Sequence, residues 1–168
     1  GRWVLGLGVR AQDPCQGEIK GAGMTLEFGD FAPAEILDER FRPFAFYGGW
    51  PCNAKLLHGE PLTDFNVISA AGRVSTQADV VPVFAEATEA TTPLHHSATS
   101  MATFFYVLQG TCRVSAAESG ESILLSEGDC LHVGDESASA RAWSGRAVGV
   151  KNGGETLLYR LQFSSPIE

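Results

Sequence analysis

Short alternations of apolar and polar residues, separated by turn residues about every 8 to 12 positions, constrain the fold of this chain more than any other feature. In GMTLEFGD, residues 23–30, Met24, Leu26 and Phe28 alternate with polar residues before a Gly-Asp turn. A period of two is typical of a strand buried on one face. Further strands are predicted at residues 44–47, 55–57, 65–69, 80–84, 104–108, 112–114, 123–125, 130–133 and 156–163. The pattern indicates an all-β sandwich or barrel.

Helical periodicity is weak throughout. The best candidate, APAEILDERF at residues 32–41, is short, contains Pro33 and is interpreted as a strand with loop edges. Residues 86–103 are rich in Ala, Thr and Ser and have few large apolar residues, so they are interpreted as the connection between two β-halves. We therefore expect two domains, residues 1–88 and 89–168.

Charge and cysteine usage narrow the classes of function. The net charge is −8 and no run of Lys and Arg could follow a phosphate backbone, so neither nucleic acid nor an anionic membrane is an expected partner. The apolar runs are far shorter than the about 20 residues that span a bilayer, and a soluble, cytoplasmic protein is expected. The cysteines form no C-x-x-C pair and are interpreted as small buried hydrophobes, with two disulfides as the alternative. They are Cys15, Cys52, Cys112 and Cys130.

The second half resembles the cupin barrel. The segment FYVLQGTCRV, residues 105–114, is similar to the cupin hairpin, and residues 123–143 are similar to the later cupin motif. Metal-binding cupins place three histidines and a carboxylate around one ion. Counted in that register, the carboxylate position holds Thr103, the paired histidine positions hold His96 and Ala98, and the last histidine position falls near Ala140 or Ala142. The count predicts no metal site and no cofactor.

The remaining histidines support a weaker alternative. His95 and His96 are adjacent, so on a strand they would point to opposite faces, and they are interpreted as a solvated pair in a Thr/Ser loop. His132 alternates with Leu131 and Val133 and is interpreted as a core residue, with a catalytic base as the alternative. No nucleophile elbow or phosphate loop is found. A cupin enzyme using His96 and His132 is thus the rival interpretation.

The first half carries a more specific resemblance. GAGMTLEF, residues 21–28, and PFAFYGGWPCNAKLLHGEPLTDFNVI, residues 43–68, resemble the HutD/Ves family of small two-cupin proteins, down to the spacing of the D-F-N triplet. The chain departs from the family pattern at three places: Gly49 stands where Asp is usual, the Cys is displaced to Cys52, and Ala70-Ala71 replaces the Arg pair expected after D-F-N. The family's W-K-N-G-G-G and F-P-G-x-D-R segments do not precede residue 21, which indicates an N-terminally shortened or divergent member. The VKNGGETLLYRL segment, residues 150–161, echoes the first of them and is interpreted as a hairpin turn.

This resemblance implies an all-β double cupin that binds a small molecule, with no established metal or reaction and with links to histidine utilisation and stress response. Its first half would end at residue 88 and its second would span residues 89–168. A regulatory role is compatible with such binding. A dimeric interaction module without a working pocket is the second alternative, because an incomplete first barrel would expose strand edges.

The candidate ligand site surrounds the D-F-N triplet. Asp64 and Asn66 lie two apart on a predicted strand, so their side chains share a face and could bind a polar or carboxylate metabolite. Trp50 is the predicted aromatic wall, His58 lies nearby in sequence, and Arg73 is the nearest cation. The alternative is that Asp64 and Asn66 cap the preceding turn. We expect non-catalytic binding, with a homodimer as a further possibility.

Overall fold

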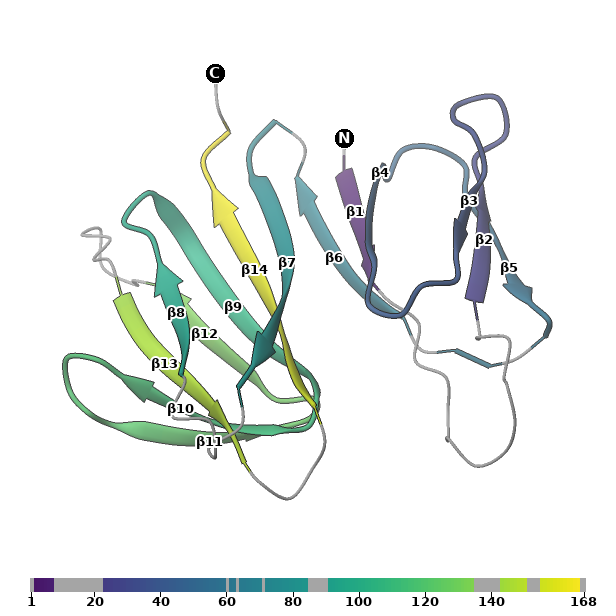
Figure 1. The fold of residues 1–168 in the computed structure, drawn as a ribbon. Helices are drawn as coiled ribbons and strands as arrows, with labels where there is room; N and C mark the ends of the chain where they lie inside the picture. Colours follow the sequence, from purple (N-terminus) through teal and green to yellow (C-terminus); the bar gives the residue numbers. More distant parts are fainter. Residues whose placement is uncertain are drawn as a thin grey trace. The chain divides into compact units, whose positions relative to one another are not determined.

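A computed structural model describes residues 2–7, 23–59, 61–62, 64–70, 72–84, 91–134, 143–150 and 155–166, and the regular structure of these residues is β-strand (Figure 1). For residues 2–7 the description is limited to the backbone. The strands are β1 (Arg2–Leu7), β2 (Gly23–Glu27), β3 (Glu35–Leu37), β4 (Pro43–Tyr47), β5 (Asn53–Leu57), β6 (Phe65–Ala70), β7 (Ser75–Val83), β8 (Thr92–His96), β9 (Ser100–Gln109), β10 (Thr111–Ala116), β11 (Ser122–Ser126), β12 (Cys130–Gly134), β13 (Trp143–Gly149) and β14 (Thr156–Ser164). No helix in the described part of the chain is long and apolar enough to cross a membrane.

The first unit, Gly1–Gly72, holds two three-stranded sheets. One has the order β4-β1-β6 and the other β3-β2-β5, with antiparallel pairing throughout. The predicted alternation in β2 is confirmed, because Met24, Leu26 and the following Phe28 are buried. Strand β3 also confirms the strand predicted within residues 32–41.

Aromatic rings pack together in the interior of the first unit. The ring centroid of Phe28 lies 5.1 Å from that of Phe46 and 6.2 Å from that of Phe44. Phe44 and Phe46 are two apart on β4, so they face the same side and stack at 6.1 Å. Such ring pairs add stabilisation beyond the area that they bury. Large side chains therefore occupy these inward positions, and a cavity of about 530 Å³ lies to one side of Phe28.

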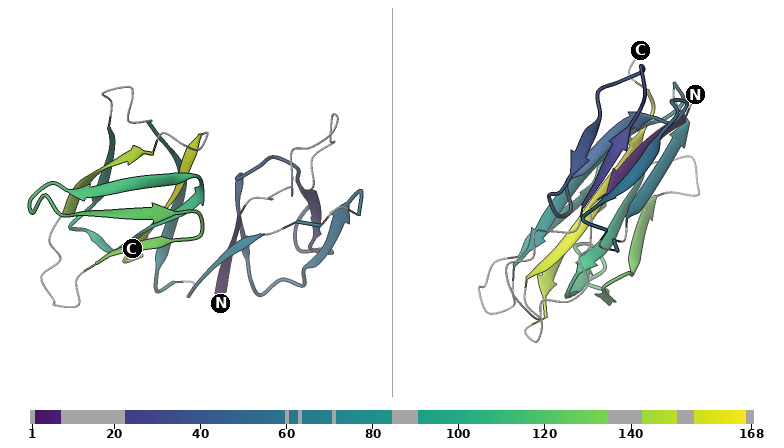
Figure 2. Two further views of the ribbon diagram at one scale, coloured as in Figure 1. Left: turned by 90° about the horizontal axis from the view of Figure 1, so that it is seen from below. Right: turned by 90° about the vertical axis from the view of Figure 1, so that its right-hand side faces the viewer.

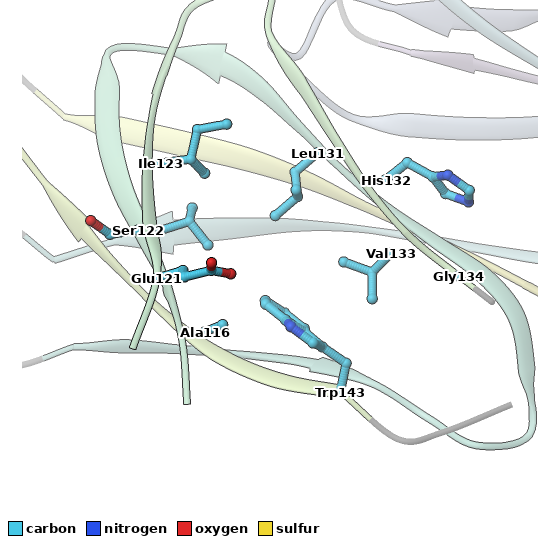
Figure 3. A pocket seen from close by; sticks show the side chains of 10 residues that line it. Ala116, Glu121, Ser122, Ile123, Leu131, His132, Val133, Gly134 and Trp143 are labelled. Carbon is cyan, nitrogen blue, oxygen red and sulfur yellow. The ribbon is translucent and has the colours of Figure 1, made fainter. Parts of the chain in front are cut away.

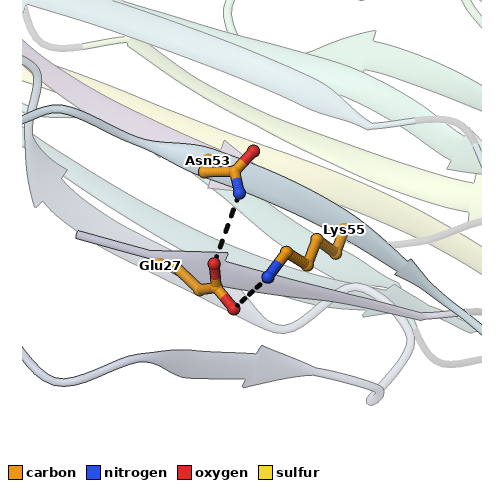
Figure 4. Close-up of polar contacts among 3 residues, drawn as sticks. All are labelled: Glu27, Asn53 and Lys55. Carbon is orange, nitrogen blue, oxygen red and sulfur yellow. Dashed lines mark hydrogen bonds and ion pairs between the residues drawn. The ribbon is translucent and has the colours of Figure 1, made fainter. Parts of the chain in front are cut away.

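On β2 and β5, polar side chains form a small exposed network (Figure 4). The carboxylate of Glu27 accepts hydrogen bonds from Lys55 Nζ at 2.7 Å and from Asn53 Nδ2 at 3.3 Å. The hydrogen bond from Lys55 lowers the pKa of Glu27 below its ordinary value. Because Asn53 and Lys55 are two apart on β5, both reach the same carboxylate from one face of the sheet.

The second unit, Arg73–Glu168, is an eight-stranded antiparallel sandwich. Its sheets have the orders β11-β10-β13-β8 and β12-β9-β14-β7, and Figure 2 shows these strands arranged around a common interior. Two four-stranded antiparallel sheets make the jelly roll of the cupins. The buried core consists of Val83, Leu94, Phe105, Val107, Cys112, Val114, Leu125, Ala147 and Leu158. The all-β, double-cupin prediction is confirmed.

The division between the units falls between Gly72 and Arg73, whereas the sequence placed it between residues 88 and 89. Strand β7 accounts for the difference. It pairs with β14 along its whole length, from Ser75 opposite Ser164 to Val83 opposite Thr156. Residues 73–84 therefore belong to the sandwich of the second unit, and residues 85–90 lie outside the described residues.

Two strands of the second unit were missed in the sequence. The expected connection at residues 86–103 instead contributes β8 and the start of β9, and β13 pairs with β8. In β8, Thr92, Leu94 and His96 are buried and alternate with exposed residues. The prediction of a loop around His95-His96 is therefore wrong. The buried and exposed residues of β8 alternate regularly, but several of them are small or polar, so the sequence does not show an apolar alternation. Position 21 of the family motif and the turn at residues 151–154 lie outside the described residues.

The cysteine interpretation holds for one position. Cys112 is fully buried, and this burial raises the pKa of its thiol to about 11. Cys52 and Cys130 are exposed, so the expectation that they are buried hydrophobes is wrong. All three are free thiols, and Cys15 lies outside the described residues.

Candidate functional site

The predicted ligand residues of the first unit have different surroundings. Trp50 is half-buried and packs against the aromatic core, with its ring centroid 5.8 Å from Phe28 and 6.1 Å from Tyr47 in edge-to-face geometry. Asp64 and Asn66 are exposed and bind each other, because Asn66 Nδ2 donates a hydrogen bond to Asp64 Oδ2 at 2.6 Å. The two side chains therefore share a face, as expected for residues two apart on a strand.

The other two predicted residues are not joined to that pair by any described contact. His58 is exposed in the turn after β5, where its φ of 58° lies in the left-handed region. Arg73 is exposed and opens the second unit. Of the five residues, the described interactions bring together Asp64 and Asn66.

A cavity of about 690 Å³ opens in the second unit (Figure 3). Its volume lies within the about 300–1,000 Å³ of typical ligand sites. The hairpin of β10 and β11 forms one wall, β12 forms another, and the start of β13 supplies an indole. The lining residues are Val114, Ala116, Glu121, Ser122, Ile123, Leu131, His132, Val133, Gly134 and Trp143.

Strand register places a row of small residues on the cavity side of the β11-β10-β13 sheet. Ala116 lies opposite Gly145 on β13, and its backbone N–H donates to the Glu121 carbonyl at 2.9 Å on the other side. Directly opposite residues of antiparallel strands point to the same face. That face is the inward one, because Val114, two residues before Ala116, is in the core. Glu121, Ala116 and Gly145 thus form one inward row.

Gly145 determines where the indole of Trp143 lies. A Cβ atom at Gly145 would come closer than 3.0 Å to the Cη2 and Cζ2 atoms of Trp143, so the ring lies across this glycine. The indole also contacts Phe105, whose ring centroid is 6.2 Å away. In addition, the backbone N–H of Ala117 donates to the Ser144 carbonyl at 3.0 Å, which fixes the hairpin tip beside β13.

On β12, successive residues point alternately into the sandwich and away from it. Leu131 and Val133 point into the cavity, whereas the ring of His132 points away from them (Figure 3). That ring stacks on Phe104 at 4.5 Å, with an interplanar angle of 16°. The prediction that His132 is a core residue is wrong, because its two apolar neighbours take the inward face.

His96 lies beside the cavity and connects the two sheets. It is 3% exposed, and its Nδ1 atom is hydrogen-bonded to Thr103 Oγ1 at 2.9 Å. His96 is on β8 and Thr103 on β9, which belong to different sheets. Their cross-strand partners are Trp143 and Val133, both of which line the cavity. His96 and His132 thus face opposite sides of their sheets and do not form one site.

The described residues at the cupin ligand positions do not form a metal site. A hydroxyl, that of Thr103, stands where metal cupins have a carboxylate, and it is bound to His96. Among the residues described, no group of three or more His, Cys, Asp or Glu is placed to hold a metal ion. Ala140 and Ala142, near the last ligand position, lie outside the described residues.

Glu121 supplies the negative charge of the cavity. The described lining includes this carboxylate and contains neither Lys nor Arg. Ser119 Oγ donates to Glu121 Oε2 at 3.3 Å and accepts from the backbone N–H of Glu121 at 3.2 Å. The carboxylate is thereby tied to the hairpin turn, and the rest of the wall is mostly apolar.

Comparison with known proteins identifies the family. The HutD family model matches residues 16–149, well over half of the chain. The chain belongs to the HutD family.

Solved structures show the fold of this HutD protein. PA5104 of Pseudomonas aeruginosa PAO1, a conserved protein of unknown function, matches with a TM-score of 0.69 at 19% identity, covering 98% of this chain and 73% of that one. At this identity the match shows the fold. Weaker matches are NMB1881 of Neisseria meningitidis, with a TM-score of 0.37, 17% identity and coverage of 57% and 79%, and the cupin protein BF4112 of Bacteroides fragilis, with 0.36, 15%, 57% and 70%. None of the curated proteins matches the chain.

The cavity of the HutD protein was not predicted from the sequence, because the residues that line it come from separate segments of the chain. Glu121 lies in the polar turn SGES, and the WSG segment at Trp143 has no apolar alternation. Strand register alone brings them to one face. The available signal was the pair Trp143 and Gly145, in which a large ring and an absent side chain occupy neighbouring positions of one strand face.

Proposed function

We propose that this HutD-family protein is a binding protein for a small organic molecule with an apolar body, held in the cavity of the second unit. The observation that carries the proposal is the inward row of small residues beside Trp143, which leaves about 690 Å³ open between the β10–β11 hairpin and β12. Ligand sites of this kind combine an apolar wall with few polar groups. Leu131, Val133 and Ile123 supply such a wall.

The proposal assigns binding rather than catalysis. The described lining offers one carboxylate, that of Glu121, and one imidazole, that of His132, whose ring stacks on Phe104. His96, buried beside the cavity, is bound to a threonine hydroxyl. The carboxylate metabolite expected from the sequence stays a prediction, since no described cation lines this cavity. The first-unit residues Trp50, His58, Asp64, Asn66 and Arg73 likewise stay a predicted site. Loss of a ligand's stabilisation in Asp64→Ala, together with its survival in Ala116→Leu, would favour that site over the cavity.

A thermal-shift screen of aryl and alkyl compounds with neutral, anionic and cationic head groups tests the proposal. The matched variants are Ala116→Leu, which fills the inward row, and Ala117→Leu, which adds the same volume at the next, exposed position. A ligand at about 100 times its Kd stabilises the folded state by about 2.7 kcal/mol. We expect Ala116→Leu to lose that stabilisation and Ala117→Leu to keep it. Stabilisation that survives Ala116→Leu would place the ligand elsewhere.

A further inference from the structure

Glu121 immediately precedes β11 and continues the inward positions of that strand at the cavity. Inward positions recur every second residue, at Leu125, Ile123 and Glu121. Leu125 is buried, but Ile123 is 50% exposed although it faces inward, because the cavity opens beside it. An apolar wall therefore runs along β11 and ends at a carboxylate. This arrangement fits a ligand with an apolar body and one polar end.

The carboxylate retains acceptor capacity. Its described hydrogen bond, from Ser119 at 3.3 Å, is long and uses one of the about four acceptor sites of an ionised carboxylate. A carboxylate can only accept hydrogen bonds, so the polar end of the ligand must donate. A second anion at this position would be repelled.

Trp143 lies at the other end of the inward row from Glu121. Adjacent strands lie about 4.8 Å apart, so β11 and β13, with β10 between them, are about 10 Å apart. Ala116 and Gly145 fill little of that span, and the indole lies over Gly145. Aromatic faces attract cations, and Trp does so most strongly. The Glu121 carboxylate and the Trp143 indole are thus two groups of the described lining that attract cations.

We propose that this cavity selects organic cations, primary ammonium groups on a compact apolar body, with Glu121 as the counter-ion and Trp143 as the aromatic face. The inference rests on the proposed function, since it assigns the head group of the molecule that the cavity binds. The net charge of −8 favours the approach of such ligands, because a negative surface raises the local concentration of cations.

Isothermal titration with three probes of equal body and different head group tests the inference: 2-phenylethylamine, 2-phenylethanol and phenylacetate. The variants are Glu121→Gln and its control Glu118→Gln. Both residues are exposed and lie in the same hairpin, but of the two only Glu121 is among the lining residues of the cavity. We expect the amine to bind at least about tenfold more tightly than the other two probes. Glu121→Gln should raise the Kd of the amine about tenfold and leave that of the alcohol unchanged, and Glu118→Gln should change neither.

The outcomes separate the inference from the proposed function. Equal Kd values for the three probes, tighter binding of phenylacetate, or equal effects of the two variants would overturn the cation selectivity while leaving a binding cavity. If none of the probes binds, the alcohol included, both the selectivity and the cavity's binding role are overturned. Amine binding that weakens in Glu121→Gln and in Ala116→Leu supports both.

Discussion

The two units of this protein use the same kind of antiparallel sheets and leave space in different places. In the first unit, Phe28, Phe44 and Phe46 pack against one another between the sheets, and a cavity of about 530 Å³ lies to one side of Phe28. In the second, Ala116 and Gly145 occupy an inward row, and a cavity of about 690 Å³ remains beside it. The size of the residues in an inward row thus influences where a small β-sandwich leaves room for a ligand.

The comparison also separates family resemblance from the candidate site. The motifs typical of HutD proteins lie in the first unit, around the aromatic core and the D-F-N triplet. Trp50, which was predicted to form a ligand wall there, is half-buried and packs on Phe28. The cavity lies in the unit whose sequence resembles cupins only in general terms. The motifs that suggested the family and the proposed binding cavity therefore lie in different units.

The largest loss of stability is expected from removing a ring of the aromatic cluster in the first unit. Phe28→Ala removes a ring that is 1% exposed, and we expect a loss of about 3–5 kcal/mol in the free energy of unfolding, measured with urea. Phe31→Ala is the control, because Phe31 is 60% exposed and three residues away. Similar losses for both variants would contradict the view that aromatic packing holds this unit together.

Filling the small row should have the next largest effect. Gly145→Ala places a methyl group against the indole of Trp143 and the Ser115 carbonyl, and overpacking of this kind costs about 1–3 kcal/mol. Adding Trp143→Leu removes the clashing ring atoms, so the double variant should be more stable than the sum of the two single variants predicts. Additive effects in urea unfolding would show that the ring does not depend on the glycine.

Two variants at adjacent positions of β8 test the buried hydrogen bond between His96 and Thr103. His96→Ala leaves the buried Thr103 hydroxyl without its partner, and we expect a loss of about 1–3 kcal/mol in the free energy of unfolding. His95→Ala removes an exposed ring from the opposite face of β8 and should have little effect. If both variants lost equal stability, the hydrogen bond between the sheets would not be the cause.

The smallest effect is expected at the exposed network of the first unit. The hydrogen bond from Lys55 lowers the pKa of Glu27 below 4.5, so the carboxylate stabilises the folded state above the pKa of the unfolded chain. Glu27→Gln should lower the Tm by no more than about 2 °C at pH 7. This difference should disappear as the pH falls below 4.5 and through the folded pKa. Thermal melts from pH 3 to 7 measure it, and a difference that grows in acid would contradict this assignment.

Particular residues show which parts of the fold and of the candidate site could be predicted from the sequence. Met24, Leu26 and Phe28 predicted β2 because each strand face carries one kind of residue. Strand β8 was missed because Thr92 and His96 are buried polar residues that pair with Pro82 and Thr103, contacts that no local pattern reveals. Glu121 was missed for a related reason. It lies in an ordinary turn sequence, and only its register with Ala116 turns it inward.

The contact between Gly145 and the ring of Trp143 also has a consequence for redesign. Positions 143 and 145 act as a single volume: any sequence that enlarges residue 145 must shrink residue 143, and a smaller residue 143 frees space that residue 145 can take. The two codons therefore offer a compact library, in which the capacity of the cavity can be tuned in steps while the acidic end at Glu121 stays untouched.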